Sequence, residues 1–291
     1  MKFKAIMNHK PSLIIATFIC FLLSTQLLPG CQSDNVPKEK YFQFFSKSAV
    51  SIKNDTLQCL LNNPLDCPLR FYISTSDSDL NKLLFYLYPV TVRPGTDTFF
   101  KIKTHLLTSD KIKTSWSTSL GDPERKIVYN KVSLPFCKGK SYKIVQGYNG
   151  QHSHNHDYSR FAIDFNLNTN DTICAADDGV VVGVIKDYKI GGNNKRLEDF
   201  ANFITLYHRH TGLYTQYAHL KYNGSFVKVG DIVNQGQPIG LAGSTGWVTA
   251  AHLHFNVLIP IAGKDILKSV PIEFIEHCRG YDLKENDIVK K

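Results

Sequence analysis

Short runs of β-branched and aromatic residues recur along this sequence, with glycine, proline, asparagine or aspartate between them. In the first half of the chain such runs cover residues 49–52, 69–73, 88–92 and 98–102. Runs of this length and composition are typical of β-strands, because branched and aromatic side chains pack well on a pleated surface. The pattern therefore predicts a mainly β protein with little helix.

The chain has 291 residues, of which 43% are hydrophobic, and this is enough for about two domains with buried cores. We expect residues 41–120 to form a β-sandwich of the immunoglobulin type that serves as an accessory domain. Residues 130–280 should form a second domain, after a turn-rich boundary at residues 121–125. The charged tail of residues 281–291 is expected to fray.

The N-terminus is typical of a secretory signal. Lys2, Lys4 and Lys10 precede an apolar stretch, residues 13–28, that contains no acidic residue. The stretch is short for a membrane-spanning helix, which favours a signal peptide over residues 1–30. An ordinary cleaved signal without lipidation, or an uncleaved anchor, is the alternative.

The signal ends in Gly30-Cys31, which resembles the lipobox of bacterial lipoproteins, where the cysteine is diacylated and becomes the new N-terminus. Acyl chains hold a protein on a membrane because each buried methylene contributes to binding. We therefore predict that a lipidated Cys31 anchors the protein to a membrane of the bacterial cell envelope. Residues 31–40 would then form a polar tether.

Removal of the signal lowers the formal net charge from +9 to +6, because three lysines and no acidic residue leave with it. This charge is modest and no nucleic-acid-binding motif accompanies it, so nucleic acid is not expected as a partner. The longest apolar run lies in the first 30 residues, which excludes a multi-span membrane protein. The sequence does not indicate an oligomeric state.

Five cysteines follow Cys31, and an oxidising envelope compartment would allow them to pair. The segment between Cys59 and Cys67 has Asn63-Pro64 at its centre, which favours a turn. A disulfide that closes this turn is one prediction, and two buried thiols are the alternative.

The residues able to bind a metal concentrate between positions 147 and 255. The first cluster contains His152, His154 and His156. Asp164 follows in residues 162–167, where apolar residues alternate with small or polar ones. The carboxylate should therefore lie on the strand face opposite the core side chains.

Two further clusters follow. His219 ends a predicted strand of residues 214–219, while His252 and His254 lie two positions apart and so point to the same side of one strand. Neutral imidazoles and a carboxylate are normal zinc ligands, and three protein ligands with one open position are typical of a catalytic zinc site. The three clusters therefore predict zinc as the cofactor.

Taken in order, the motifs resemble those of the lysostaphin/LytM-type zinc metalloendopeptidases, peptidoglycan endopeptidases with the duplicated hybrid motif fold. The resemblance rests on residues 134–136, 146–150, 153–154, 162–165, 175–181, 217–220, 229–233, 236–240, 243–246 and 252–255. It implies an antiparallel β-sheet peptidase domain that binds one zinc ion at a groove between two sheets.

By this resemblance the zinc ligands are His154, Asp164 and His254, while His219 and His252 stand beside the metal as catalytic residues. Family members with a short first motif place its histidine three residues before the aspartate, but this chain has the longer form. His156 is therefore an alternative to His154 as the first ligand.

His208 and His210 repeat the two-residue spacing of the third cluster. They precede Thr211-Gly212, a predicted hairpin turn, so they should lie near a loop end and are not expected to bind the metal. The long basic loop of residues 186–201 is expected to form one wall of the groove. The alternative is a mobile surface hairpin.

The resemblance implies a zinc endopeptidase that cleaves the peptide cross-links of peptidoglycan. No His-Glu-x-x-His sequence supplies a glutamate base, so His219 or His252 should carry the proton and the other should stabilise the oxyanion. The sequence does not assign the two roles. The alternatives are an endopeptidase that acts on an extracellular or envelope protein, and a non-catalytic regulator of other wall hydrolases.

Overall fold

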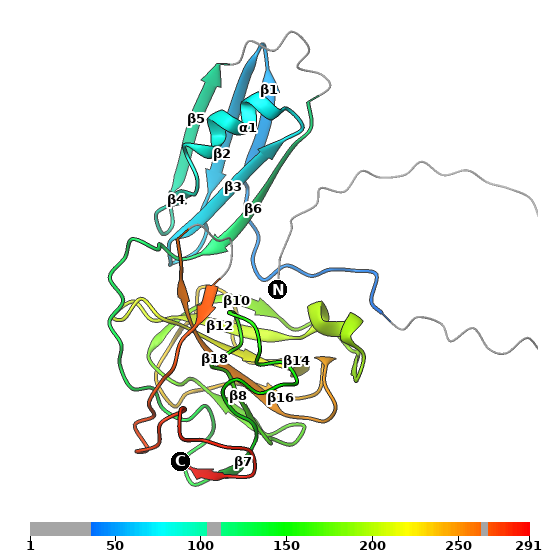
Figure 1. Ribbon diagram of the computed structural model, residues 1–291, viewed down its shortest axis with the longest axis vertical. Helices are drawn as coiled ribbons and strands as arrows, with labels where there is room; N and C mark the ends of the chain where they lie inside the picture. The colour runs from blue at the N-terminus through cyan, green and yellow to red at the C-terminus, as the bar shows by residue number, and fades with distance from the viewer. Residues whose placement is uncertain (1–35, 104–111, 263–266) are drawn as a thin grey trace, which may run out of the picture.

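The computed structural model of the protein describes residues 36–103, 112–262 and 267–291 (Figure 1). The predicted signal peptide, the lipidated Cys31 and most of the predicted tether lie outside these residues. Within them the protein is mainly β, as the sequence predicts. No helix of this described part is long and apolar enough to cross a membrane.

The N-terminal unit contains two three-stranded antiparallel sheets and lies at one end of the molecule (Figure 1). The strand orders are β1-β2-β5 and β4-β3-β6. The strands are β1 (Ala49–Lys53), β2 (Thr56–Asn62), β3 (Leu69–Thr75), β4 (Val90–Val92), β5 (Asp97–Lys103) and β6 (Thr114–Leu120). Four of them fall on the predicted runs, and β2 and β6 are additional. The immunoglobulin type of this unit stays a prediction.

The helix α1 (Ser78–Phe85) interrupts this β unit and was not expected from the sequence. Asp77 caps it, since the Asp77 side chain accepts hydrogen bonds from the backbone N–H groups of Asp79 and Leu80. Leu80 and Leu84 lie one turn apart, so both are buried on the side of the helix that contacts β3. A cap and two leucines are enough for this short helix because the sheet supplies its packing.

The second unit is built on a nine-stranded sheet with the order β15-β10-β12-β13-β18-β8-β7-β20, and β19 pairs with β18. Its strands are β7 (Ser141–Gln146), β8 (Ile163–Phe165), β10 (Gly179–Ile185), β12 (Phe203–Tyr207), β13 (Tyr214–Ala218), β15 (Ile232–Val233), β18 (Leu253–Pro260), β19 (Leu267–Ser269) and β20 (Ile288–Lys290). A three-stranded sheet contains β9 (Thr172–Cys174), β14 (Leu220–Ser225) and β16 (Pro238–Ala242). The remaining elements are β11 (Gly191–Gly192), β17 (Gly246–Trp247) and the 3-10 helix η2 (Lys195–Phe200).

The small sheet packs on one face of the large sheet, which we call the inner face. Leu253 and Phe255 of β18 lie in the same buried cluster as Ile173 of β9 and Ile239 of β16. Because neighbouring residues of a strand point to opposite sides, His254 lies on the outer face. The expected groove between the two sheets is therefore wrong, since apolar side chains fill the space between them.

The N-terminal unit covers part of the outer face. Tyr214 of β13 and Leu258 of β18 belong to one buried cluster with Leu57 of β2 and Phe71 of β3. The two units therefore share a hydrophobic core, although the predicted boundary at residues 121–125 separates them along the chain. The part of the outer face that the N-terminal unit leaves uncovered contains the candidate site.

Arg70 of β3 lies at this contact and is fully buried. Its Nη1 donates to the carbonyl of Ile261, which follows β18, at 2.9 Å. Its Nη2 donates to the carbonyl of Leu120 at 3.1 Å and to Ser119 Oγ at 3.0 Å. One guanidinium group thus satisfies backbone carbonyls from both units.

The predicted disulfide between Cys59 and Cys67 is wrong, and the alternative of two buried thiols is correct. Cys59 alternates with Leu57 and Leu61 along β2, so all three point into the core. The Cys67 thiol instead contacts the hydroxyl of Tyr214 in the other unit. Burial raises the pKa of Cys59 to about 11 and that of Cys67 to about 12, so both thiols are unreactive at neutral pH.

The predicted fraying of residues 281–291 is also wrong. β20 pairs with β7 as the last strand of the large sheet, and Val289 is buried. The Nζ of Lys291 donates to the carbonyl of Leu134 at 2.7 Å. The hydrogen-bond partners of this strand come from residues far away along the chain, so the charged local composition did not indicate it.

We expect Arg70→Leu to lower the free energy of unfolding by about 2–4 kcal/mol, because it leaves the buried carbonyls of Leu120 and Ile261 without their donor. Urea denaturation followed by tryptophan fluorescence measures the change. Arg93→Leu is the control, since Arg93 is exposed, and it should shift the unfolding free energy by less than about 0.5 kcal/mol. Equal stabilities of the two variants would contradict the bridging role.

Candidate metal centre

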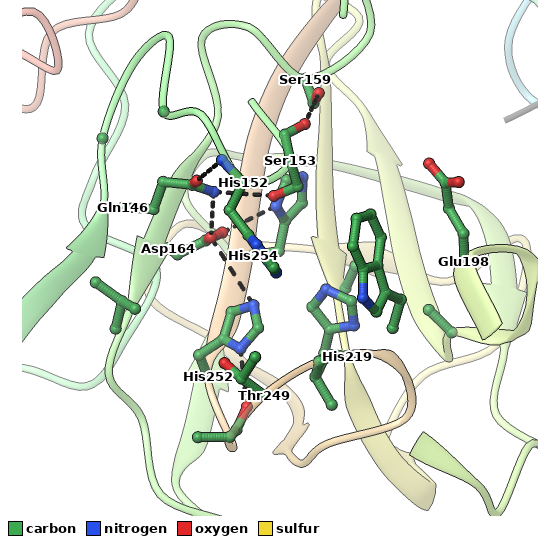
Figure 2. Close-up of a pocket in the computed structure, with 18 of the residues that line it drawn as sticks. Gln146, His152, Ser153, Ser159, Asp164, Glu198, His219, Thr249, His252 and His254 are labelled. Atoms are coloured by element: carbon green, nitrogen blue, oxygen red, sulfur yellow. Dashed lines mark hydrogen bonds and ion pairs between the residues drawn. The ribbon is translucent and has the colours of Figure 1, made fainter. Parts of the chain in front are cut away.

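A cavity of about 870 Å³ opens on the uncovered part of the outer face (Figure 2). Its floor is formed by side chains of β8, β13 and β18, among them Asp164, Gln216 and His254. Residues 145–159 form one wall, and η2 with the segment 247–252 forms the other.

Two predicted ligands face each other across neighbouring strands. In the β8–β18 register His254 stands directly opposite Asp164. Their neighbours on both strands, Ile163, Phe165, Leu253 and Phe255, point into the inner core. Both polar side chains therefore emerge on the outer face, where His254 Nδ1 lies 2.9 Å from Asp164 Oδ1.

The third predicted ligand, His154, comes from the turn-rich segment that precedes β8. It is fully buried, and its Nδ1 donates to the carbonyl of Gly147 at 2.8 Å. Its Nε2 lies 3.2 Å from Asp164 Oδ1 and 3.3 Å from His254 Nδ1. The structure thus brings His154 to the other two side chains, whereas His156 is exposed at the cavity wall.

The three donor atoms have the spacing that one zinc ion needs. Zinc bound tetrahedrally at about 2.0–2.2 Å places its ligand atoms about 3.3–3.5 Å apart. The observed separations among His154 Nε2, Asp164 Oδ1 and His254 Nδ1 are 2.9, 3.2 and 3.3 Å. In the described part of the chain this is the one group of three His, Cys, Asp or Glu side chains with such close donor atoms.

The protonation states also favour a cation. Burial would raise the pKa of the Asp164 carboxyl, but the surrounding imidazoles, those of His154 and His252 first, hold this pKa well below its usual range. Burial lowers the pKa of His254. For His154, the charge of Asp164 outweighs burial and raises the pKa. Binding of a divalent metal requires the ionised carboxylate and neutral imidazoles, so the ion would replace the proton that Asp164 favours on His154.

His219 and His252 stand next to Asp164 and His254, and the ring centroids of His219 and His252 are 4.6 Å apart (Figure 2). His219 has a positive φ of 64°, which turns the chain from β13 into β14. Its Nδ1 lies 2.8 Å from the carbonyl of Thr245, and His252 Nδ1 lies 3.0 Å from that of Ala250. Because carbonyls only accept, Nδ1 carries the proton in each ring and Nε2 is left unprotonated.

Gln146, at the end of β7, orients the carboxylate, a role that the sequence did not assign. Its Nε2 donates to Asp164 Oδ2 at 3.1 Å and to Ser153 Oγ at 2.9 Å. Its Oε1 accepts from the backbone N–H of His152 at 3.1 Å. Residues 146–150 are one of the motifs that carry the family resemblance, but a single sequence does not indicate that the glutamine of this motif reaches Asp164.

The loop of residues 186–201 forms one wall, as one of the two interpretations predicts. Glu198 of η2 lines the cavity on the side away from Gln146 (Figure 2). β11 pairs in parallel with β17, and a Cβ atom at Gly191 would collide with the carbonyl oxygen of Ser244. Leu197 is buried in a small cluster behind this wall.

His208 and His210 lie away from the cavity, as predicted. Both ring nitrogens of His208 have protein partners, the carbonyl of Asp178 at 2.8 Å and Thr215 Oγ1 at 2.9 Å. His210 Nε2 lies 3.0 Å from Asp177 Oδ2. The backbone hydrogen bonds of His208 hold the turn that joins β12 to β13.

Residues 158–266 match Peptidase family M23. The match includes Asp164, His219, His252 and His254, and it begins after His154. The chain thus carries a peptidase domain of family M23, of the lysostaphin/LytM type, as the motifs indicate.

Two curated relatives are similar over this region. A glycyl-glycine endopeptidase of Staphylococcus capitis is 37% identical over 122 residues, which are 40% of this chain and 29% of the relative. A peptidoglycan DD-endopeptidase of Vibrio cholerae is 31% identical over 135 residues, which are 45% of this chain and 28% of the relative. The chain thus spans less than a third of the length of either relative.

Among solved structures, the catalytic domain of lysostaphin from Staphylococcus simulans is 27% identical. The comparison covers 45% of this chain and 88% of that domain, with a TM-score of 0.32. The family assignment rests on the sequence matches.

Replacing His154, Asp164 or His254 by alanine removes one of three donor atoms, so we expect zinc content to fall from about one ion per chain to below about 0.2. Inductively coupled plasma mass spectrometry after dialysis measures it. His219→Ala and His252→Ala should retain most of the zinc.

His156→Ala is the matched control for His154→Ala, because the two histidines lie two residues apart and only His154 reaches Asp164. A protein that keeps its zinc after Asp164→Ala or His254→Ala would contradict the ligand set. If His156→Ala loses zinc and His154→Ala retains it, then His156 and not His154 is the first ligand.

Proposed function

We propose that the protein is a zinc-dependent endopeptidase that cleaves the peptide cross-links of bacterial peptidoglycan. The observation that carries this proposal is the triangle of His154, Asp164 and His254 donor atoms beside two further imidazoles in an open cavity. The names of the two relatives, a glycyl-glycine endopeptidase and a peptidoglycan DD-endopeptidase, support the substrate class.

Zinc bound to these three side chains would lower the pKa of a bound water towards neutrality and polarise the scissile carbonyl. Asp164 would bind through Oδ1, because Gln146 already donates to Oδ2. His154 and His254 would bind through Nε2 and Nδ1, the atoms that lie next to Oδ1.

His219 and His252 would accept and donate the proton during peptide-bond hydrolysis. Each has an unprotonated Nε2, so either ring can accept a proton from the attacking water. The resulting imidazolium can donate to the carbonyl oxygen or to the leaving amine. Burial lowers the pKa of His219 to about 3, so this ring starts neutral at pH 7 and gives up an acquired proton readily.

The charge of the cavity supports a peptide rather than an anionic polymer as substrate. Glu198 and Glu285 line it, and no lysine or arginine is present among its described lining residues. The chain as a whole has a formal net charge of +9, so the lining of the cavity differs from the rest of the protein in its lack of positive side chains. It disfavours nucleic acid as the substrate of this site.

A non-catalytic regulator is less well supported, because such a protein has no need for a complete set of ligands and proton carriers. An endopeptidase that acts on an envelope protein would use the same site, so only the substrate distinguishes it. For the cellular location, we propose a lipoprotein of the bacterial envelope that is anchored through Cys31, on the basis of the signal and lipobox alone.

The protein without its signal should release peptides from purified peptidoglycan, measured by liquid chromatography and mass spectrometry. We expect His219→Ala and His252→Ala to lower the release rate about 100-fold or more while zinc stays bound. His210→Ala, outside the cavity, is the control and should keep full activity. Absence of release by the zinc-loaded protein, with cleavage of an envelope protein, would favour the alternative substrate.

Cys31→Ser should move the protein from the membrane fraction to the soluble fraction, because diacylation needs the thiol. Fractionation and intact mass measurement of the N-terminal peptide test this. Cys278→Ser is the control and should leave the protein on the membrane. A wild-type protein with an unmodified N-terminus, or one that starts elsewhere, would refute the anchor.

A further inference from the structure

Two cysteines that the sequence analysis left unassigned lie in contact. Cys137 precedes β7 and Cys174 ends β9, and their Sγ atoms are 3.2 Å apart. Both are free thiols in the structure, and Cys137 is half-buried, whereas Cys174 is 1% exposed. Among the described residues no other two cysteine sulfurs lie within hydrogen-bonding distance of each other.

The backbone holds the two residues at this distance. Phe136 forms an antiparallel bridge with Ile173, and both side chains are fully buried in the inner core. The backbone N–H of Cys174 donates to the carbonyl of Pro135 at 3.0 Å. A disulfide has a sulfur–sulfur distance of about 2.05 Å, so the two sulfur atoms would have to approach by about 1 Å from their separation of 3.2 Å.

We propose that Cys137 and Cys174 form an intramolecular disulfide bond in the exported protein. The two thiols lose two protons and two electrons to an oxidant of the disulfide class, such as oxidised glutathione. The more accessible Cys137 thiolate attacks the oxidant and releases one thiol. The Cys174 thiolate then attacks the sulfur of Cys137 and releases the second.

The accessibility of the two thiols fits this order. Burial raises the pKa of Cys174 to about 12, so Cys174 is the poorer first nucleophile. Cys59 and Cys67, for which the sequence left a disulfide and two buried thiols open, lie in the other core as free thiols, and no sulfur–sulfur contact joins them among the hydrogen bonds of the described residues. The proposed disulfide therefore lies in the peptidase unit and not in the N-terminal unit.

The bond would close the segment that supplies two of the three candidate metal ligands. The two cysteines are 37 positions apart, and His154 and Asp164 lie between them. A cross-link around a loop of this size removes conformational freedom from the unfolded chain. It therefore favours the folded form of the ligand-bearing segment, whatever substrate the site accepts.

The test uses the full chain, exported and purified without reductant. Free thiols are alkylated in denaturant, and the digest is searched for a peptide pair that contains Cys137 and Cys174 and that disappears after reduction. We expect this pair, together with alkylated Cys59, Cys67 and Cys278. Alkylation of both Cys137 and Cys174, after equilibration with excess oxidised glutathione, would overturn the proposal. Pairing of either one with another cysteine would also overturn it.

Reduction should lower the Tm of the wild-type protein on the order of 5–10 °C. Cys137→Ser should have this lower Tm already and should not respond to reductant; it replaces only a half-buried thiol. Cys278→Ser, also at a half-buried position, is the matched control and should respond as the wild-type protein does. A wild-type Tm that is independent of reductant would overturn the stabilising role.

Discussion

The pairing of β8 with β18 is the constraint on which the rest of the peptidase unit depends. It places Asp164 opposite His254 on the outer face, while their neighbours Phe165 and Phe255 pack in the inner core. A shift of one residue in either strand would bury the polar side chain and expose the aromatic one. The hydrophobic core therefore sets the position of the metal-binding side chains.

Hydrogen bonds around the site then orient the imidazole rings. Backbone carbonyls of Gly147, Thr245 and Ala250 each accept from the Nδ1 of one imidazole, so Nε2 is the nitrogen of each ring that faces the site without a backbone partner. Loops of otherwise unrelated sequence thus control the tautomers of the histidines. The buried carboxylate of Asp164 is the centre of this arrangement, because the imidazoles around it hold its pKa well below the usual range and so keep it ionised.

Local patterns predicted many of the strands, and the ordered motifs, through their resemblance to a known family, supplied the candidate ligands. The alternation around Asp164 and the spacing of His252 and His254 are properties of single strands, so they can be read without the fold. What the sequence did not indicate depends on distant partners. β20 forms only against β7, the Gln146 amide reaches Asp164 across a turn, and the outer position of the cavity depends on which face the small sheet covers. The predicted disulfide between Cys59 and Cys67 was wrong for the same reason, since contact between two sulfur atoms depends on tertiary packing.

The core shared by the two units has an evolutionary consequence. Tyr214 and Leu258 of the peptidase sheet are buried by side chains of the N-terminal unit, and Arg70 joins carbonyls of both. Replacing one unit by an unrelated domain at residues 121–125 would therefore remove half of a shared hydrophobic core. Neither unit buries its apolar surface without the other, so a change on one side of this contact is expected to require a compensating change on the other.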